Sequence, residues 1–116
     1  MTLYFYGVQT QRRPNAENKP EYELAFVCRE VEARETAKLY LPTQEREFPC
    51  YLTRLPKDRV DTWEIRDNWV ILTKPDEDAA RAVWRRYFEE NAESLTRRAE
   101  ECRKQAEEWR NMAASL

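Results

Sequence analysis

The sequence contains no histidine, and among its 116 residues there is a single glycine, Gly7. Histidine is the usual general base, proton shuttle and metal ligand near neutral pH. Its absence excludes Ser-His-Asp and Cys-His catalytic sites built within one chain. A Walker loop and a GxGxxG turn each need several glycines, so both are excluded as well. Carboxylate or lysine chemistry stays open, but no motif indicates it, and we expect neither an enzyme nor a cofactor.

Cysteines are few, widely spaced and odd in number: Cys28, Cys50 and Cys102. No CxxC pair occurs, so we expect no metal site. The first residues lack a basic start, and no run of 18 apolar residues occurs, so we expect neither a secretion signal nor a membrane span. Free, buried thiols in a reducing cytoplasm are the expected state.

The sequence also lacks an excess of positive or negative charge. Twenty Lys and Arg residues face 22 Asp and Glu residues, which gives a net charge of −2. A polymeric nucleic acid requires a basic footprint, and an acidic DNA mimic requires the opposite excess. We therefore expect neither class. Hydrophobic residues make up 41% and charged residues 36% of the chain, as in a soluble protein with a large wet surface.

Alternation of apolar and polar residues predicts an antiparallel sheet of five or six strands in residues 1–74, curved or barrel-like. The alternation changes parity within residues 21–33, which predicts a bulge or strong bend near Cys28 to Glu30. Residues 66–68 predict the turn of a closing hairpin. The predicted strands are residues 2–9, 21–33, 36–42, 46–55, 60–65 and 69–73.

Residues 75–116 carry the signals of one long helix. Thr73 and Asp76 can each cap its start, and Pro75 suits the first turn. No glycine or proline follows. The chain is thus predicted to be α+β, a single structural domain with an antiparallel β part and a long C-terminal helix used for oligomerisation.

Two columns with a period of seven run along this helix. Large residues occupy Phe88, Leu95, Cys102, Trp109 and Leu116, and alanines occupy Ala92, Ala99, Ala106 and Ala113. A strict seven-residue period predicts left-handed pairing of helices, and an alanine column lets two backbones approach closely. This pattern favours an antiparallel pair of identical helices with two-fold symmetry. The predicted oligomer interface is Phe88, Leu95, Ala99, Cys102, Ala106 and Trp109.

Length supports pairing between chains. A helix of about 38 residues is about 57 Å long. A compact domain of this size has a radius of gyration of about 13 Å, so the helix cannot lie wholly on its own sheet. The other interpretation is that the helix breaks into a hairpin and buries the two columns within the chain.

A third column contains Trp84, Asn91, Arg98, Gln105 and Met112. Polar groups in an apolar seam are costly unless they find partners. They either fix the register of pairing or line a pocket for a polar ligand. Aromatic faces and guanidinium groups are what a nucleotide requires, for stacking and for phosphate binding. For Trp84 and Phe88, core packing competes with ligand contact. The candidate ligand-binding residues are Trp84, Phe88, Asn91, Arg98 and Arg110.

The order of these elements resembles the first Thoeris anti-defence family of phage proteins. The resemblance covers LYFYGVQT, then EYELAFVCREVEARETAKLYLP, then TWEIRDNWVILT, which leads into the helix start KPDEDAARAVWRRYFEEN. It implies a sponge that sequesters the cyclic ADP-ribose-type signal of Thoeris defence, and in some members the cyclic oligonucleotides of CBASS, without turnover. It also implies dimers and a hexamer with ligand sites between protomers, in the cytoplasm of the infected bacterial host.

Two other classes remain. A phage inhibitor, similar to anti-CRISPR proteins, would cover a bacterial defence effector with the helix or a sheet edge. A structural or assembly protein would use the helix only to oligomerise. Which signal is bound, and in what stoichiometry, the sequence leaves open.

Overall fold

The computed structural model of the chain describes residues 1–14, 20–43, 47–49 and 52–116. A five-stranded antiparallel sheet is followed by one long helix, α1 (Glu77–Ser115), so the predicted α+β fold is confirmed. Because α1 runs unbroken, the hairpin interpretation of the helix is wrong. The chain divides into two compact units, Met1–Trp84 and Arg85–Leu116. The first unit extends past the predicted boundary at residue 74 and includes the start of α1.

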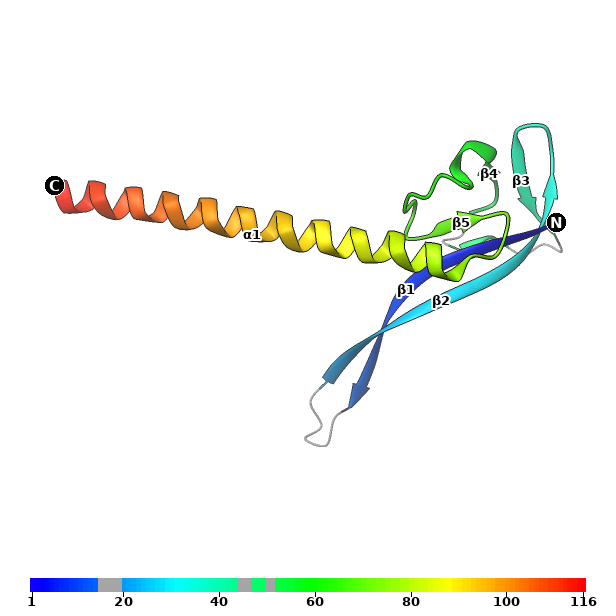
Figure 1. Ribbon diagram of the computed structural model, residues 1–116, viewed down its shortest axis with the longest axis horizontal. Coiled ribbons are helices and arrows are strands. Elements are labelled where there is room, and N and C mark those ends of the chain that lie inside the picture. Colours follow the sequence, from blue (N-terminus) through cyan, green and yellow to red (C-terminus); the bar gives the residue numbers. More distant parts are fainter. Residues whose placement is uncertain (15–19, 44–46, 50–51) are drawn as a thin grey trace. The chain divides into compact units, whose positions relative to one another are not determined.

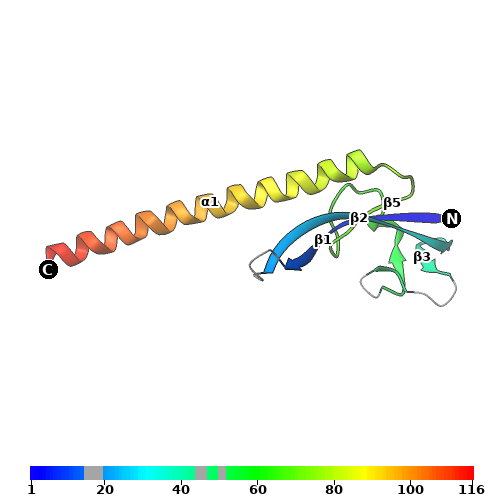
Figure 2. The same ribbon diagram turned by 90° about the horizontal axis from the view of Figure 1, so that it is seen from below.

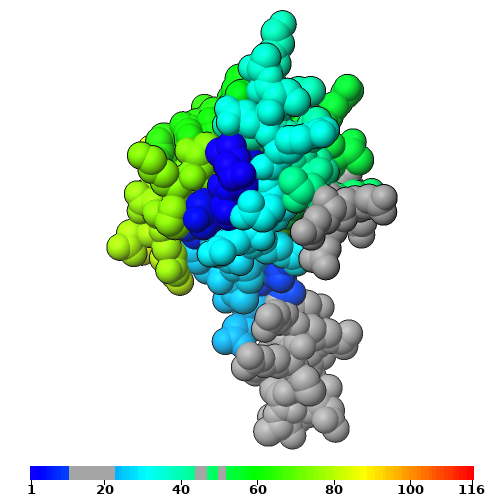
Figure 3. All heavy atoms as spheres, turned by 90° about the vertical axis from the view of Figure 1, so that its right-hand side faces the viewer, coloured from blue at the N-terminus to red at the C-terminus, as the bar shows by residue number. Residues whose placement is uncertain are grey.

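The strands of the first unit form one curled sheet in the order β4-β3-β2-β1-β5 (Figure 1). Neighbouring strands are antiparallel throughout. In the space-filling view of Figure 3, the blue start of β1 is flanked by cyan residues of β2, in agreement with this order. The strands are β1 (Thr2–Pro14), β2 (Pro20–Glu35), β3 (Leu39–Pro42), β4 (Leu55–Pro56) and β5 (Val70–Leu72).

β1 and β2 pair without interruption, from Thr2 opposite Glu32 to Pro14 opposite Pro20. No residue is inserted near Cys28, so the predicted bulge is wrong, although both strands bend along their length (Figures 1 and 2). Side chains of a strand alternate between the two faces of a sheet. The parity change has another cause, because both faces of this sheet are covered and each needs apolar residues.

Core one lies on the inner face of the curled sheet. Leu3 and Phe5 of β1 are fully buried there, and the Phe5 ring lies 5.7 Å from that of Phe48 and 6.1 Å from that of Trp69. Residues from every strand contribute, so this cluster holds the curl together. Its buried members are Leu3, Phe5, Ala33, Tyr40, Phe48, Leu55, Val60, Trp69 and Ile71.

Core two lies on the opposite face, beneath the start of α1. Tyr6 alternates with Phe5 along β1 and therefore faces this side, where its ring stacks on Phe26 with centroids 5.9 Å apart. Arg81 of the helix lies over the same Phe26 ring at 4.4 Å. The buried members are Tyr6, Val70, Leu72, Ala80 and Trp84.

The predicted turn before β5 is confirmed. Arg66 and Trp69 exchange both backbone hydrogen bonds, at 2.9 Å each. Asp67 and Asn68 between them have φ angles of 51° and 71°, the left-handed values that a two-residue hairpin turn requires. The Trp69 ring then lies against Gly7, where a Cβ atom would stand 2.7 Å from ring carbons. The only glycine of the sequence therefore makes room for a tryptophan.

Two predicted strands are wrong. Among the described residues of 46–55, an isolated bridge joins Phe48 to Leu52, and β4 starts only at Leu55; Cys50 lies outside the described residues. Residues 60–65 form an irregular segment after the short 3₁₀ helix η2 (Lys57–Arg59). Its apolar residues serve different cores, since Val60 belongs to core one and Ile65 packs against core two.

Candidate functional site

The start of α1 is fixed to the sheet by hydrogen bonds within the first unit. Asp76 Oδ1 accepts from the Ala79 amide at 3.1 Å, the N-cap geometry, and the Asp76 amide donates to Tyr6 Oη at 3.1 Å. Asp76 is thus the cap. Thr73, the other predicted cap, instead donates from its hydroxyl to Asp61 at 2.6 Å.

Trp84 belongs to core two. It is 5% exposed, and its Nε1 donates to the Tyr6 carbonyl oxygen at 3.1 Å. A buried indole usually finds such a partner, because an unsatisfied N–H is costly in an apolar surrounding. Trp84 therefore packs in core two, and its contact with a ligand stays a prediction.

The second unit, Arg85–Leu116, is one stretch of helix in which no residue is buried. Phe88 is 41% exposed, Leu95 63% and Trp109 65%. The remaining predicted interface residues Ala99 and Cys102 are exposed, and Ala106 is half-buried. We call the surface formed by the columns of large residues and alanines the seam face. Within one chain this face is open to solvent.

The predicted ligand residues of this unit, Phe88, Asn91, Arg98 and Arg110, are all exposed. Phe88 and Arg110 are 22 positions apart, which is about 33 Å along a helix. One small ligand therefore cannot contact them all from a single chain. The structure brings Phe88 together with Tyr87, whose ring lies edge-on at 5.6 Å. Beside this pair, Arg86 approaches Glu90 at 3.9 Å, an exposed ion pair of little energetic weight.

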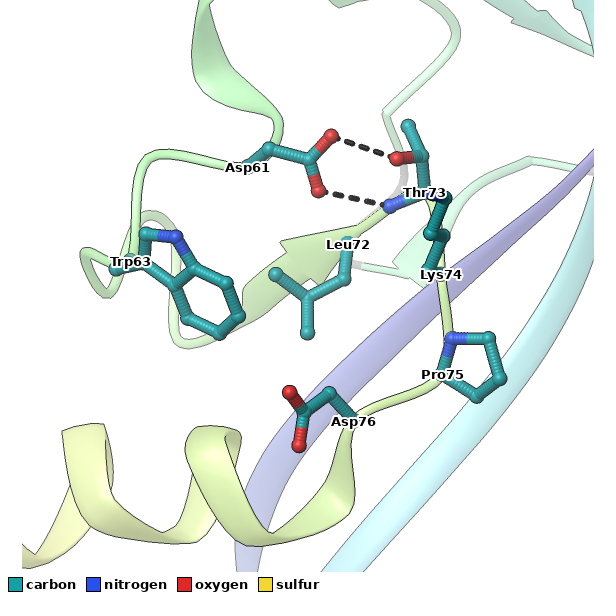
Figure 4. Close-up of a pocket in the computed structure, with 7 residues that line it drawn as sticks. All are labelled: Asp61, Trp63, Leu72, Thr73, Lys74, Pro75 and Asp76. Carbon is teal, nitrogen blue, oxygen red and sulfur yellow. Dashed lines mark hydrogen bonds between the residues drawn. The ribbon is translucent and has the colours of Figure 1, made fainter.

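The first unit contains a pocket of about 550 Å³ that the sequence analysis does not predict (Figure 4). The Asp61 carboxylate accepts from the Thr73 amide at 2.9 Å, and the Asp61 amide donates to the Ile71 carbonyl at 2.9 Å. Asp61 and Trp63 have left-handed φ angles of 57° and 58°. The lining residues are Asp61, Trp63, Leu72, Thr73, Lys74, Pro75 and Asp76.

The chemistry of this pocket disfavours an anion. In Figure 4, Trp63, Leu72 and the Asp76 carboxylate surround the same space, and Asp61 lies at its rim. The lining carries two carboxylates, Asp61 and Asp76, and one ammonium group, Lys74, so its net charge is negative and disfavours a phosphate. The aromatic face next to the carboxylates suits a cationic group. The left-handed positions that shape the pocket are occupied by an aspartate and a tryptophan. A glycine there would have been the signal from which such a loop is usually predicted.

Tyr6 and Cys28 lie opposite each other on β1 and β2. Burial raises the pKa of the Tyr6 hydroxyl, and the neighbouring Cys28 thiolate raises it further. The pKa of Cys28 is also raised, chiefly by burial of its sulfur. Cys28 and Cys102 are free but exposed in the chain, so the expectation of buried thiols is wrong for both. A raised pKa makes the Cys28 thiol a poor nucleophile at neutral pH.

The described part of the chain contains neither a cluster of metal ligands nor a helix that could span a membrane. Among them, no three acidic or thiol side chains gather where a metal ion could be held. Over the same ranges, no helix combines the length and the apolar character needed to cross a bilayer.

Comparison with known proteins leaves the site to be argued from its own geometry. No protein-family model, no curated protein and no solved structure that we compared with the chain matches it. The seam face, the pocket and the residues they contain are therefore the features that bear on function.

Proposed function

We propose that this chain is a self-associating binding protein that sequesters a nucleotide-derived signal without degrading it. The signal would be of the cyclic ADP-ribose type or a cyclic oligonucleotide, captured in the cytoplasm of an infected bacterial host. The observation that carries the proposal is the open seam face of Arg85–Leu116, whose large apolar side chains are flanked by the guanidinium groups of Arg98 and Arg110. The resemblance to phage anti-defence proteins supports the same class.

The exposure of large apolar side chains supports self-association. Leu95, Trp109 and Met112 are each more than 60% exposed, with values of 63%, 65% and 62%. Exposed apolar surface of this extent on one face typically marks an interaction site. Because the column period is seven, the surface that covers it best is another helix with the same period.

The aromatic and guanidinium side chains of the second unit support ligand binding. Phe88 and Tyr87 offer aromatic faces on which a base can stack, and Arg98 offers a planar set of donors for a phosphate. About 33 Å separates Phe88 from Arg110 along one helix. A site that uses both an aromatic ring and a distant arginine therefore needs two chains. The pocket beside Trp63 is a poor second choice for this ligand, because Asp61 and Asp76 would face its phosphates.

Calorimetry tests the proposal. The protein is titrated with cyclic ADP-ribose isomers and with cyclic di- and trinucleotides, and the recovered ligand is analysed by mass spectrometry. We expect heat with at least one of them and ligand recovered intact. Arg98→Ala should lower the affinity at least tenfold. The matched control is Arg97→Ala, the neighbouring arginine outside the three columns, which should leave affinity unchanged.

Absence of heat with every nucleotide would end the ligand part of the proposal. A ligand recovered in cleaved form would contradict sequestration. Co-elution of the protein with a defence effector on a sizing column would instead favour direct inhibition of that effector, since a sponge leaves effectors untouched. If Arg98→Ala and Arg110→Ala change nothing while Leu95→Glu breaks the oligomer, assembly alone is the function.

A further inference from the structure

The seam face has one arrangement in which a second copy of the chain fits it best, and the sequence of the columns defines that arrangement. We propose that two copies pair antiparallel, with the two-fold axis between Glu100 and Glu101, so that Glu89 of each copy forms an ion pair with Arg110 of the other. The inference depends on the self-association part of the proposed function but not on its ligand.

The orientation follows from side-chain volume. In a parallel, in-register pair, layers of two alanines would alternate with layers of two large residues, such as Trp109 against itself. Interfaces pack to a uniform density, so such layers would leave voids beside overpacked contacts. In an antiparallel pair every layer holds one alanine and one large residue. The layers then differ less in volume than those of a parallel pair, and an alanine in each layer lets the backbones stay close.

The column positions allow this register, and the charges beside them select it. With the axis between Glu100 and Glu101, every alanine meets a large residue of the other copy, and Phe88 to Ala113 overlap over about 39 Å. The layers are Ala92 with the partner's Trp109, Ala99 with the partner's Cys102, Ala106 with the partner's Leu95, and Ala113 with the partner's Phe88.

Charges beside the seam support the same register. Residues that directly follow the large column flank it on one edge, and they include Glu89 and Arg110. In this register Glu89 lies across from the partner's Arg110, and symmetry repeats the pair at the other end. Such flanking pairs select partner and orientation in helix pairs.

The neighbouring registers place like charges against each other. A shift of seven positions in one direction exchanges the Phe88 layer for one between Ala92 and the partner's Leu116, and it sets Arg103 of one copy against Arg103 of the other. A shift in the other direction sets Arg98 of one copy against Arg98 of the other, places Trp109 against an arginine and loses one packed layer. Like charges that face each other are destabilising, so each shift gains a repulsion.

The register also gives different roles to two candidate ligand-binding residues, Arg98 and Arg110. Arg110 is engaged across the seam. Arg98 lies on the other edge, directly across from the partner's Gln105, which is uncharged. Of the two arginines, Arg98 is therefore the one left to meet an anionic ligand, near the two-fold axis.

Disulfide crosslinking tests the orientation in full-length chains whose three cysteines are replaced by serine. In this background, the double variant Phe88→Cys with Ala113→Cys should form a covalent dimer on mild oxidation, because the two positions meet in one layer. Phe88→Cys alone should form no covalent dimer, since in this register about 37 Å separates position 88 of one copy from position 88 of the other. A dimer formed by the single variant would show parallel pairing and overturn the inference.

A charge exchange tests the register independently of crosslinking. Glu89→Arg and Arg110→Glu should each raise the dissociation constant of the dimer about tenfold in sedimentation, from two lost pairs and two repulsions. The double exchange should restore it to near the original value. Failure of the double exchange to restore pairing overturns the register. A monomer at tens of micromolar overturns the self-association itself, whereas calorimetry with nucleotides decides the ligand proposal separately.

Discussion

The two units of the chain bury their apolar side chains to very different extents. All the buried hydrophobic residues that the structure describes lie in Met1–Trp84, shared between the two faces of one sheet. In Arg85–Leu116, by contrast, Phe88, Leu95 and Trp109 are between 41% and 65% exposed. Both regions belong to one sequence of 116 residues and carry large hydrophobic side chains. The difference therefore lies in whether those side chains are covered within the chain.

The comparison teaches that periodicity and location must be considered together. In the sheet, the period of two supplies each face with apolar residues, and both faces are covered within the chain. In the helix beyond Trp84, the period of seven supplies a face that the described chain leaves open. A helix of this kind depends on packing for most of its stability, because propensity and i, i+4 ion pairs contribute only tenths of a kcal/mol each.

The largest expected effect is a loss of stability in the first unit. Phe5 is fully buried between Phe48 and Trp69, and Phe5→Ala should lower the free energy of unfolding of the first unit by about 3–5 kcal/mol. Urea unfolding followed by tryptophan fluorescence measures it. Leu24→Ala, at a residue that is 57% exposed, is the control and should stay within about 0.5 kcal/mol. Equal losses in the two variants would contradict the assigned core.

The second-largest expected effect is a loss of pairing, which depends on protein concentration and should involve only the second unit. Leu95→Glu places a charge in the seam face and should raise the dissociation constant of the dimer at least about 100-fold. The urea midpoint of the first unit should not move. Sedimentation velocity and fluorescence on the same sample measure the two quantities. Arg97→Glu, a change of charge outside the columns, should alter neither; an equal loss of pairing there would show that net charge and not the seam is responsible.

A smaller effect tests the only glycine. The methyl group of Gly7→Ala would stand 2.7 Å from Trp69 ring carbons, and Trp69 is 7% exposed and held in core one. Overpacking of this kind should cost about 1–3 kcal/mol in urea unfolding. Gly7→Ala combined with Trp69→Phe should lose less than the sum of the single changes, because the smaller ring restores room. Additive losses would mean that the two residues do not interact.

The smallest effect is a dependence on pH. The pKa of Tyr6 is raised above its ordinary value of 10.0, and that of Cys28 above 9.0, in each case chiefly by burial. The folded state holds these protons more tightly, so their contribution is fully present below pH 9 and is lost as pH rises through the folded values. Unfolding free energies between pH 8 and 11 should therefore fall above pH 9. Cys28→Ser should delay the fall toward pH 10; an unchanged profile would contradict the coupling.

Long, regular elements could be predicted from the sequence, and irregular ones could not. The paired strands β1 and β2 and the helix α1 extend over many residues, so local pattern and packing agree. Residues 60–65 show the opposite. Val60 and Ile65 look like alternate positions of a strand, but each is apolar because it contacts a different core. A single sequence cannot reveal that a sheet has two covered faces when one of the covers is a helix start.

The candidate site likewise has one part that could be predicted from the sequence and one part that could not. The seam face is a repeat within one helix, and the sequence alone places its residues. The pocket beside Trp63 needs left-handed backbone at Asp61 and Trp63, and neither position carries the glycine that usually marks such a conformation. Trp84 lies in the third helical column and was open to both interpretations. Only the hydrogen bond from its indole to the Tyr6 carbonyl assigns it to the core.

The hydrogen bond at Trp84 has a consequence for amide exchange along α1. Up to Trp84, the helix opens only when core two opens, so its amides should exchange with the stability of the first unit. Beyond Arg85, the proposed pairing would protect the same helix only where the second copy covers it, and that protection would follow mass action. Tenfold dilution should therefore speed exchange in the C-terminal turns and leave the first two turns unchanged. One continuous helix would then report two separate equilibria, with the change between them at a single tryptophan.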